Sequence, residues 1–372
     1  MLDERPRLTY LISSLEVGGA ERGMSRLLTG LVDDYDITVV SLRGGQKGIL
    51  AELPDAIRTL DLNIQSVRNT VQLRHLCSEL VKTDILVCSL YHAAVIGTTI
   101  GRTARVSTIL TWQHNESFST RFRKQLFGVA ARLSDRVLAD SKTVARMIEQ
   151  TYGSAVSVAI VPIAGVETDQ FAPSKTDCGI NSTETTVGIL GSLTNQKNHD
   201  AVLTAADRLQ DEQIRFEIAG KGPRQTELRE IVTDRELKNV QFRGFVDDAP
   251  SFLNNLDIYV QPSNYEGLCI TAIEAMSCGL PVVATDVGGL SESVVDNETG
   301  YLVEPGNLDA FVDRICDLHA SPKRRDRMGR RARQRVIDQY SRTTLVDEFT
   351  TVLTTARANT TVNRYGRRGI EQ

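Results

Sequence analysis

The chain has 372 residues, more than one hydrophobic core usually serves, so its length predicts two domains of roughly 150 to 190 residues. Hydrophobic residues make up 41% and charged residues 24%, with 10 prolines and 27 glycines, which excludes a wholly disordered or collagen-like chain. The 43 lysines and arginines nearly balance the 47 aspartates and glutamates, for a net charge of -4, so no nucleic-acid partner is expected.

No apolar run approaches the roughly 20 residues that span a bilayer, and Met1 to Pro6 contains no apolar signal region. We therefore expect a cytoplasmic protein. The six cysteines form no Cys-x-x-Cys pair and sit mostly in apolar or helical stretches, so we expect buried thiols rather than disulfides or a zinc site. They are Cys77, Cys88, Cys178, Cys269, Cys278 and Cys316.

Short β-branched runs alternate with amphipathic stretches in the first half of the chain, which is a βαβ rhythm. Helical crossovers imply parallel strands, and strands this uniformly apolar imply a sheet covered on both faces. The predicted fold class is therefore α/β, with a doubly wound parallel sheet. The expected strands are 8–14, 37–42, 85–89, 106–112, 136–139 and 156–161.

The chain becomes polar after Pro173, and the same rhythm resumes at Thr186. We expect strands at 186–190, 216–219, 240–243, 258–260 and 281–284, with helices near 198–209, 223–234, 268–278 and 308–319. The prediction is two Rossmann-like domains facing across a cleft, with ligands at the carboxyl ends of the strands. The expected parts are a first domain (1–170), a linker (171–186), a second domain (187–338), a helix returning to the first domain (339–358) and a disordered polar tail (359–372).

The first strand is followed by Glu16-Val17-Gly18-Gly19-Ala20-Glu21-Arg22 and then by a helical pattern. Paired glycines let backbone N–H groups approach an anion at a helix N-terminus, although a tight turn needs the same residues. The spacing is not Gly-x-Gly-x-x-Gly, which argues against a nicotinamide-dependent oxidoreductase.

Two histidines, His92 and His114, follow predicted strands at the ends where ligands are expected. His114 has polar neighbours on both sides, in Trp112-Gln113-His114-Asn115-Glu116, which suits a hydrogen bond to a sugar hydroxyl. His114 is therefore the candidate site residue of the two.

In the second half, the strand ending at Leu190 is followed by Gly191-Ser192-Leu193-Thr194-Asn195-Gln196-Lys197. A glycine turn with a lysine at the start of a helix forms a phosphate cradle with a point charge, although an ordinary surface lysine fits the pattern too.

The most informative stretch runs from Pro262 to Ala284. The first free amides of its helix are assigned to Gly267, Leu268 and Cys269, where a diphosphate would bind. Glu266 and Glu274 are eight residues apart, about 12 Å along a continuous helix, and could hold opposite ends of an extended nucleotide sugar. Helix capping by Glu266 and simple solvation of Glu274 are the alternatives.

This stretch resembles the retaining glycosyltransferases of family 4, also called glycosyl transferases group 1, which have the two-domain GT-B fold. Glu266 and Glu274 match that family's E-x7-E motif, and Ala275 to Val283 matches its continuation. Gly18-Gly19-Ala20-Glu21 is similar to its glycine loop and Val161 to Phe171 to its inter-domain signature, so the resemblance covers nearly the whole chain.

The resemblance implies that Glu266 contacts the transferred sugar near the reacting carbon and that Glu274 binds the ribose hydroxyls. It implies that Lys197 binds the diphosphate, His114 the sugar from the opposite domain and Gly19 the phosphate side. The implied catalytic residues are Glu266, His114 and Lys197. The implied substrate-binding residues are Gly18, Gly19, Gly191, Ser192, Val246, Gly267, Leu268, Cys269 and Glu274, with the backbone around Val246 meeting the base. The nucleotide sugar is a co-substrate, and no metal or other cofactor is implied.

Two positions depart from the family pattern. Ser192 stands where the family usually has arginine, and Ala164 replaces the customary asparagine of the inter-domain signature. The first departure removes a cation from the leaving group and puts its stabilisation more heavily on Lys197 and the helix amides.

The implied reaction is transfer, with retention, of a hexosyl or N-acetylhexosaminyl group from a nucleotide sugar, with a UDP-sugar favoured over a GDP-sugar. The expected acceptor is a glycan or a lipid-linked glycan in cell-surface polysaccharide or glycoconjugate synthesis. A GT-B nucleotide-sugar epimerase or phosphorylase is the main alternative, ahead of the oxidoreductase and of a sugar-binding protein of periplasmic type, which would need a secretion signal.

Residues 117–146 carry seven basic and two acidic side chains, a local charge of +5. If this segment is helical, Phe118, Phe122 and Leu126 form an apolar stripe with basic neighbours. These neighbours are Arg121, Arg123 and Lys124. The pattern favours peripheral docking on the anionic inner face of the cell membrane, although the stripe could instead pack on its own sheet.

Overall fold

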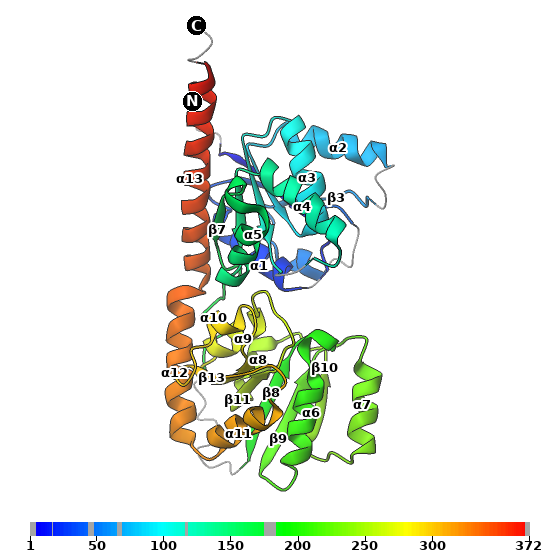
Figure 1. The fold of residues 1–372 in the computed structure, drawn as a ribbon, viewed down its shortest axis with the longest axis vertical. Helices are drawn as coiled ribbons and strands as arrows, with labels where there is room; N and C mark the ends of the chain where they lie inside the picture. The colour runs from blue at the N-terminus through cyan, green and yellow to red at the C-terminus, as the bar shows by residue number, and fades with distance from the viewer. Residues whose placement is uncertain are drawn as a thin grey trace. The chain divides into compact units, whose positions relative to one another are not determined.

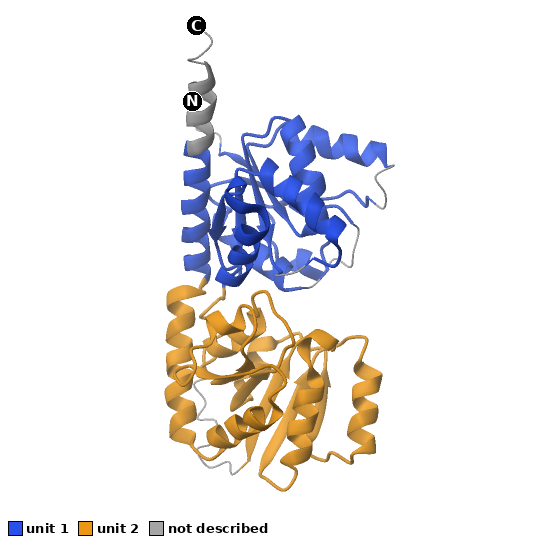
Figure 2. Cartoon of the chain, viewed as in Figure 1, with its two compact units in different colours: residues 1–165, 342–372 blue, residues 166–341 orange. Residues whose placement is uncertain are grey.

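The computed structural model describes residues 5–16, 18–43, 48–64, 69–115, 118–174 and 184–368, with the side chains of 359–368 excepted. Val17, Glu116, Cys178 and most of the expected linker therefore lie outside the described residues. The chain divides into two compact units (Figure 1 and Figure 2). Unit 1 comprises Met1–Gly165 and Arg342–Gln372, and unit 2 comprises Val166–Ser341.

Unit 1 contains a seven-stranded parallel sheet in the order β3-β2-β1-β4-β5-β6-β7. Apolar side chains point to both faces of its central strands, so β1, β2, β4 and β5 are almost entirely buried. The strands are β1 (Arg7–Ile12), β2 (Asp36–Ser41), β3 (Arg58–Asp61), β4 (Ile85–Ser89), β5 (Thr108–Gln113), β6 (Arg136–Ala139) and β7 (Val158–Ile160).

Helices connect these strands and cover the sheet. They are α1 (Gly19–Leu31), α2 (Thr70–Leu80), α3 (Tyr91–Thr103), α4 (Arg121–Leu133) and α5 (Lys142–Tyr152), with short turns η1 (Gly48–Glu52) and η2 (Gly153–Ala155). Side chains of α2 and α3 pack with β1, β2 and β4, while those of α4 and α5 pack with β6 around Phe127. The chain thus forms a doubly wound layer structure.

Unit 2 contains a six-stranded parallel sheet in the order β10-β9-β8-β11-β12-β13. Its strands are β8 (Thr185–Leu190), β9 (Ile214–Ala219), β10 (Val240–Gly244), β11 (Ile258–Gln261), β12 (Val282–Thr285) and β13 (Gly300–Val303). Its helices are η3 (Asn195–Lys197), α6 (His199–Arg208), α7 (Gln225–Asp234), α8 (Ala249–Asn254), α9 (Ile270–Ser277), α10 (Leu290–Ser293), α11 (Leu308–His319) and α12 (Pro322–Gln339). The predicted class, two α/β units with parallel sheets, is confirmed.

Both strands that the sequence analysis missed, β3 and β13, lie at sheet edges. β3 pairs on one side only and is largely exposed, so it lacks the continuous apolar run of a central strand. β13 is buried but has four residues, and it begins at Gly300, where a side chain would collide with the backbone of Val282. The close approach of β13 to β12 therefore requires glycine at this position, and glycine weakens the sequence pattern by which a strand is predicted.

The last helix, α13 (Arg342–Arg368), completes the core of unit 1. Its buried side chains recur at helical spacing, and the ring of Phe349 stacks on Trp112 of β5 at 6.0 Å between centroids. The buried set is Leu345, Phe349, Leu353 and Ala356. The helix continues through residues 359–368, where the sequence analysis expected a disordered tail, because a helix once formed adds one hydrogen bond per residue and no proline interrupts it.

The described cysteines are free thiols. Cys88, Cys269 and Cys278 are buried as expected, whereas Cys77 and Cys316 are only partly covered.

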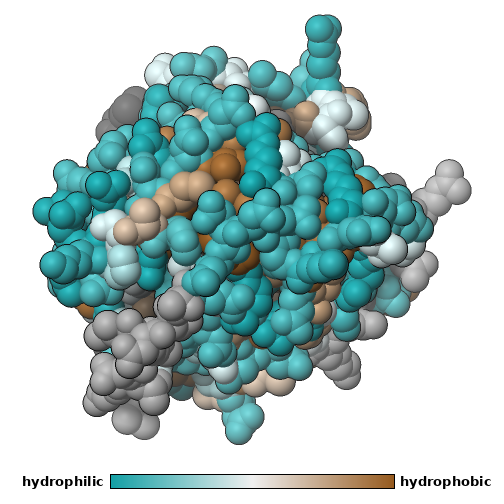
Figure 3. All heavy atoms as spheres, turned by 90° about the horizontal axis from the view of Figure 1, so that it is seen from below, coloured by the Kyte–Doolittle hydropathy of each residue, from teal (hydrophilic) through white to brown (hydrophobic). Residues whose placement is uncertain are grey.

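Within the described ranges, no helix is both long and apolar enough to cross a membrane. The face drawn in Figure 3 is mainly hydrophilic, with a short band of apolar residues bordered by polar ones.

His199 is a fully buried histidine at the first position of α6. Neither ring nitrogen has a hydrogen-bond partner among the described residues. Burial, with the positive charges of Lys197 and Arg224, lowers the pKa of His199 from 6.5 to about 4. In the unfolded chain the same imidazole takes up its proton near its ordinary pKa.

We expect the free energy of unfolding to fall by about 1.4 kcal/mol per pH unit between pH 6.5 and 4 on account of this one group, because the unfolded state then binds the extra proton. Thermal unfolding measured at several pH values tests it. His199→Leu should flatten the dependence, whereas His75→Leu, which removes an exposed histidine of α2, should not. Equal slopes in parent and His199→Leu would contradict the assignment.

Candidate active site

Polar loops follow β8, β9, β10 and β11 at one edge of the unit 2 sheet. These strands are neighbours in the order β10-β9-β8-β11 and run parallel, so their carboxyl ends meet. Lys197 ends η3 after β8, and Glu266 lies in the loop after β11. The two residues are 69 positions apart in the chain and are brought together by the pairing of β8 with β11.

Lys197 and Glu266 form a buried ion pair. The Lys197 ammonium donates to Oε1 of Glu266 at 2.7 Å, and the side chains are 14% and 5% exposed. A buried ion pair contributes little to stability unless further hydrogen bonds satisfy its atoms. A buried ion pair with a shifted pKa at a strand end is typical of a functional site.

A row of buried side chains holds Glu266 in place. Ser263 Oγ donates to Glu266 Oε1 at 2.7 Å, and Gln261 Nε2 donates to Ser263 at 2.8 Å. Tyr259 in turn donates from its hydroxyl to Gln261 Oε1 at 2.9 Å. The row starts inside β11, so the carboxylate is fixed to the sheet itself.

The second oxygen of Glu266 accepts from Gln196 Nε2 at 3.2 Å. Gln196 precedes Lys197, so the η3 turn holds the carboxylate from the other side. Because a carboxylate has about four acceptor positions, Oε2 keeps room for a further donor such as a sugar hydroxyl.

Burial disfavours the charged form of Lys197, but the hydrogen-bonded carboxylate of Glu266 opposes that effect, and the pKa of Lys197 is raised. The Lys197 ammonium also lies 3.8 Å from Cys269 Sγ. Burial raises the pKa of the Cys269 thiol. Near neutral pH the site therefore combines a charged lysine with a neutral thiol.

Gly191 and Ser192 lie where the sequence analysis expected the phosphate cradle, directly after β8. A side chain at Gly191 would touch the Lys197 side chain at 3.5 Å, and one at Gly220 would collide with the carbonyl oxygen of Gly191. Gly220 has φ +139°, which favours glycine. The loops after β8 and β9 are thus packed backbone against backbone, while Ser192 is exposed.

The loop after β11 differs from the prediction. α9 begins at Ile270, with Cys269 as its N-cap, so Gly267 and Leu268 precede the helix. Gly267 instead accepts a hydrogen bond from the backbone of Gly289 at 2.8 Å, which holds the chain in a loop. The spacing of about 12 Å assumed a continuous helix, and that assumption is wrong.

Glu274 lies in the middle of α9 and is completely buried, so the alternative of a solvated carboxylate is wrong. Val246, expected near the base, is partly exposed in the loop after β10. Beside it, Phe245 is 47% exposed and its ring lies 5.4 Å from the Lys221 ammonium. The binding roles of both regions remain predictions.

In unit 1, Gly18 is the N-cap of α1 and Gly19 its first residue, as the glycine loop predicted. A side chain at Gly18 would collide with the carboxylate of Glu21. A carboxyl group of the protein itself therefore lies at this helix N-terminus, and burial raises the pKa of Glu21. The predicted phosphate contact of Gly18 and Gly19 would share this position with a carboxyl group.

His114 follows β5 directly and is 8% exposed. Its Nδ1 lies 2.8 Å from Asp140 Oδ2 and its Nε2 lies 2.8 Å from Ser89 Oγ. The sequence pattern pointed to His114 but to neither Ser89 nor Asp140. Ser89 ends β4 and Asp140 follows β6, so a search of the residues directly after neighbouring strands would have found both.

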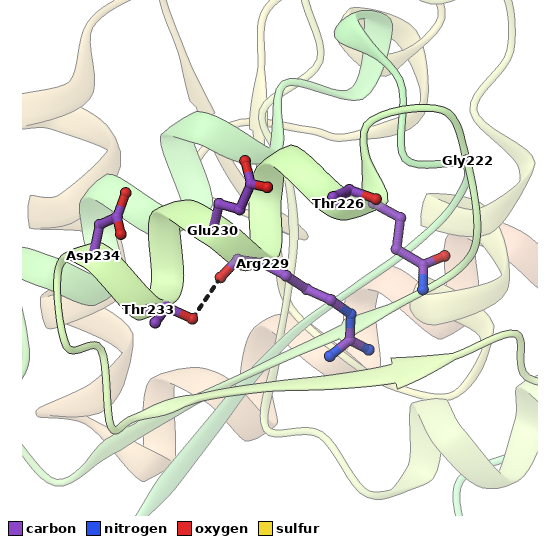
Figure 4. Close-up of a pocket in the computed structure, with 7 residues that line it drawn as sticks. Gly222, Thr226, Arg229, Glu230, Thr233 and Asp234 are labelled. Atoms are coloured by element: carbon purple, nitrogen blue, oxygen red, sulfur yellow. Dashed lines mark hydrogen bonds between the residues drawn. The ribbon is translucent and has the colours of Figure 1, made fainter.

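One hollow of about 530 Å³ lies along α7 and does not contain the residues above. Figure 4 shows its polar lining, with Arg229 extending from α7. The Arg229 guanidinium lies over the Phe242 ring of β10 at 4.8 Å.

Across the described part of the chain, no three His, Cys, Asp or Glu side chains are grouped to hold a metal ion.

Two family models match the chain in succession. The model described as Glycosyltransferase Family 4 matches residues 17–169, and the model described as Glycosyl transferases group 1 matches residues 172–335. The second match contains Lys197, Glu266 and Glu274, and the first contains His114.

Curated relatives and solved structures agree with this. The chain is 24% identical over 347 residues, covering 85% of this chain and 88% of its relative, to the UDP-Gal:alpha-D-GlcNAc-diphosphoundecaprenol alpha-1,3-galactosyltransferase of Escherichia coli. It is 29% identical to the poly(ribitol-phosphate) alpha-N-acetylglucosaminyltransferase of Staphylococcus aureus over 45% of this chain, but spans only 35% of that relative's length. Several other curated relatives are matched over about half their length.

The fold is that of Anabaena Alr3699/HepE, solved in complex with UDP, with a TM-score of 0.83 at 20% identity over 94% of this chain and 100% of that one. A sucrose-phosphate synthase from Thermosynechococcus elongatus aligns with a TM-score of 0.78 at 18% identity, over 95% of this chain and 100% of that one. With both units matched by the family models, the chain belongs to glycosyltransferase family 4, the glycosyl transferases group 1, and is a glycosyltransferase with the GT-B fold.

Proposed function

We propose that the enzyme transfers a hexosyl or N-acetylhexosaminyl group from a UDP-sugar, with retention, to a glycan or lipid-linked acceptor. The observation that carries the proposal is the buried Lys197–Glu266 pair at the carboxyl edge of the unit 2 sheet. The lysine offers a cation that can bind a diphosphate, and the glutamate offers a carboxylate that can bind sugar hydroxyls. The two groups are joined directly by a hydrogen bond.

Lys197 suits a leaving diphosphate. An ammonium has three N–H donors, of which one goes to Glu266 and one lies near the weak acceptor Cys269. A third donor can therefore reach a phosphate oxygen, and the raised pKa keeps the lysine charged. Since Ser192 supplies no cation, the first-turn amides of α9 are the other group that could share the negative charge.

In the proposed reaction the bond between the anomeric carbon and the diphosphate oxygen breaks, and the acceptor oxygen bonds to the same carbon from the same face. The acceptor proton passes to the leaving phosphate, and free UDP results. Glu266 is tied to Lys197, Ser263 and Gln196, which suits a fixed hydrogen-bond acceptor better than a nucleophile that must move.

The names of similar proteins support a UDP-sugar as the donor. HepE was solved with UDP-glucose and TarM of S. aureus with UDP. One relative, from Mycolicibacterium smegmatis, is named a GDP-mannose-dependent mannosyltransferase, so a GDP-sugar is the donor to compare. The E. coli relative is named for a diphosphoundecaprenol acceptor, which supports a lipid-linked glycan.

We expect Glu266→Gln and Lys197→Met each to lower kcat by about 10²- to 10³-fold, because each removes a charge from a pair that faces the developing charges. Release of UDP from UDP-glucose, UDP-galactose and UDP-N-acetylglucosamine measures this with and without acceptor glycan. Glu304→Gln and Lys238→Met change the same residue types at exposed positions of unit 2 and should leave kcat unchanged. Turnover within threefold of the parent in both site variants would overturn the proposal.

The same assay separates the alternatives. A retaining transferase needs the acceptor and gives an α-linked product from an α-linked donor, whereas an epimerase acts without an acceptor and a phosphorylase needs inorganic phosphate.

We also propose that Lys197 and the α9 amides take the place that a divalent cation has in other transferases, so transfer proceeds without metal. Rates in excess EDTA should equal those in Mg²⁺ or Mn²⁺. A loss of activity in EDTA that Mg²⁺ or Mn²⁺ restores would contradict this.

A second proposal concerns an anionic membrane surface. α4 begins at Arg121, so Phe118 precedes it and packs on the buried ring of Phe127 at 5.1 Å, and the predicted stripe is wrong at that residue. The exposed apolar residues of α4 are instead Phe122, 66% exposed, and Val129, 54% exposed, which lie seven residues apart on one face.

Beside this face, α4 and α5 form a hollow of about 590 Å³ lined by three cations and by Tyr152. The cations are Arg121, Lys124 and Arg132. An anionic headgroup layer attracts basic side chains, and exposed apolar side chains on the same helix can be buried at the boundary with the acyl chains. Arg123, by contrast, lies over the Tyr91 ring at 5.0 Å, so we assign it to the protein's own packing.

We expect the parent protein to sediment with phosphatidylglycerol-containing vesicles and not with phosphatidylcholine alone. The Arg121→Ser/Lys124→Ser double variant should bind about 30-fold more weakly, since each of the two basic residues near the surface adds about 1 kcal/mol. A Lys323→Ser/Arg327→Ser variant removes two exposed cations from α12 and should bind like the parent. Equal binding of both double variants would leave a soluble acceptor as the better interpretation.

A further inference from the structure

The hollow between α4 and α5 in unit 1 is lined by basic side chains and by no acidic one. The basic side chains are those of Arg121, Lys124 and Arg132. The other lining residues are Gln125, Thr151 and Tyr152. Burial raises the pKa of the Tyr152 hydroxyl to about 12, so this group is uncharged near neutral pH. The three cations are exposed, and a ligand in solution can therefore reach them.

The positive charges of the hollow are not neutralised by the described residues. No carboxylate of the described ranges forms an ion pair with any of the three, whereas Arg102 of the same unit is paired with Asp135 at 2.8 Å. Arg132 donates to the backbone oxygen of Gly128 at 3.0 Å and lies 5.9 Å from the centre of the Tyr152 ring. These contacts hold the guanidinium in place but leave most of its five N–H groups for a ligand.

The packing of α4 against α5 fixes the shape of the hollow. The Tyr152 hydroxyl donates to the backbone oxygen of Lys124 at 2.7 Å, and the Tyr152 ring lies 6.1 Å from the buried ring of Phe127. A side chain at Gly128 would collide with the Tyr152 ring, so glycine lets this ring lie against α4. Because Lys124 makes its contact through the carbonyl, its ammonium remains available to a ligand.

The sequence also places these charges where a helix favours the opposite sign. Several other helices of the chain, α1, α6, α7 and α11 among them, have an acidic residue in the first turn, where the N–H groups give the helix end a positive partial charge. The first turn of α4 has no acidic residue and contains Arg121, Arg123 and Lys124. A negatively charged ligand in the hollow would therefore relieve repulsion among the cations and repulsion from the helix end.

Three cations in one hollow match a ligand group with more than one negative charge. The guanidinium of arginine can bind two phosphate oxygens side by side, and the ammonium of lysine binds as a point charge. A phosphodiester carries one negative charge. A diphosphate that joins a sugar to a lipid carries one on each of two adjacent phosphates. The composition of the hollow therefore favours a diphosphate over a single phosphodiester.

We propose that this hollow binds the diphosphate group of a lipid-linked acceptor, with Arg121, Lys124 and Arg132 contacting the phosphate oxygens. The inference rests on the proposed function for the lipid-linked acceptor, and it names the part of that acceptor that unit 1 recognises. It differs from attraction to a membrane surface, because it selects one substrate molecule and needs no bilayer.

Direct binding to the intact protein tests the proposal without turnover. The probes are methyl pentyl diphosphate, with one alkyl group on each phosphate, and methyl pentyl phosphate, and calorimetry measures the dissociation constant of each in the absence of membrane. We expect the parent to bind the diphosphate about 10- to 100-fold more tightly, because hydrogen bonds between charged groups are the strong ones. Equal affinities would favour a phospholipid headgroup as the occupant and would overturn the proposal, as would the absence of binding.

Three variants locate the bound diphosphate. Arg121→Ser/Lys124→Ser should bind methyl pentyl diphosphate about 10- to 100-fold more weakly than the parent. The matched control, Arg74→Ser/Arg146→Ser, removes two exposed cations from α2 and α5 for the same change in net charge, and it should bind like the parent. Lys197→Met should also keep the binding. If Lys197→Met loses the diphosphate and Arg121→Ser/Lys124→Ser keeps it, the ligand lies in unit 2 and the proposal is wrong.

Turnover separates this inference from the proposed function. With an acceptor glycan joined to a pentyl chain through a diphosphate, Arg121→Ser/Lys124→Ser should raise the KM for the acceptor about 10- to 100-fold, with the kcat and the KM for the UDP-sugar of the parent. An unchanged acceptor KM would contradict the inference and leave the transferase assignment intact. A parent that releases no UDP would refute the proposed function, while the affinities for the two probes would still decide what the hollow binds.

Discussion

Every strand pairing within the two sheets is parallel, and the position of the chemistry follows from that constraint. Parallel strands need helical crossovers, and the crossovers cover both faces of the sheet. The loops at the carboxyl ends of the strands are not covered by these helices, and ligands of parallel sheets bind there. Lys197 with Glu266 in unit 2, and Ser89 with His114 and Asp140 in unit 1, occupy that edge. Because neighbouring strands are hydrogen-bonded, residues far apart in sequence are held at fixed spacing.

Both sites bury charge, and burying charge is costly unless each group has partners. In unit 2 the cost is offset by the hydrogen bonds that Ser263 and Gln196 donate to Glu266. In unit 1 the indole of Trp112 satisfies one oxygen of Asp140 while His114 satisfies the other. Networks of this kind resist reorganisation, so the orientation of each of these side chains is fixed by the protein's own contacts.

The sequence alone predicted the α/β class and the interior strands, because β1, β4 and β11 are mainly apolar and almost entirely buried. It did not predict β3 and β13, whose positions at the edges of the sheets weaken that signal. The start of α9 was misplaced because a backbone contact between Gly267 and Gly289 shapes the preceding loop, and such a contact leaves no local pattern.

The residues of the candidate site also divide into those that the sequence predicted and those that it did not. Glu266, Lys197 and His114 could be selected because each follows a predicted strand in a polar stretch. The partners of His114 were not selected, because Asp140 lies 26 residues from His114 and its proximity depends on the order of β5 and β6 in the sheet. In α4 the helical period was correct, but the start of the helix decides which aromatic ring faces the core, and that start depends on the N-cap Thr120.

The return of α13 to unit 1 also bears on how the chain is made. Phe349 completes the packing around Trp112, and Leu345 lies against Gly165, so the core of the first unit closes only with residues from the far end of the chain. During synthesis at about 5–20 residues per second, residues 166–341 have to emerge in between, which takes roughly 10 to 35 s. For that interval the Trp112 side of unit 1 lacks its covering helix. The nascent protein therefore presents an apolar surface to chaperones long after most of its first sheet has left the ribosome.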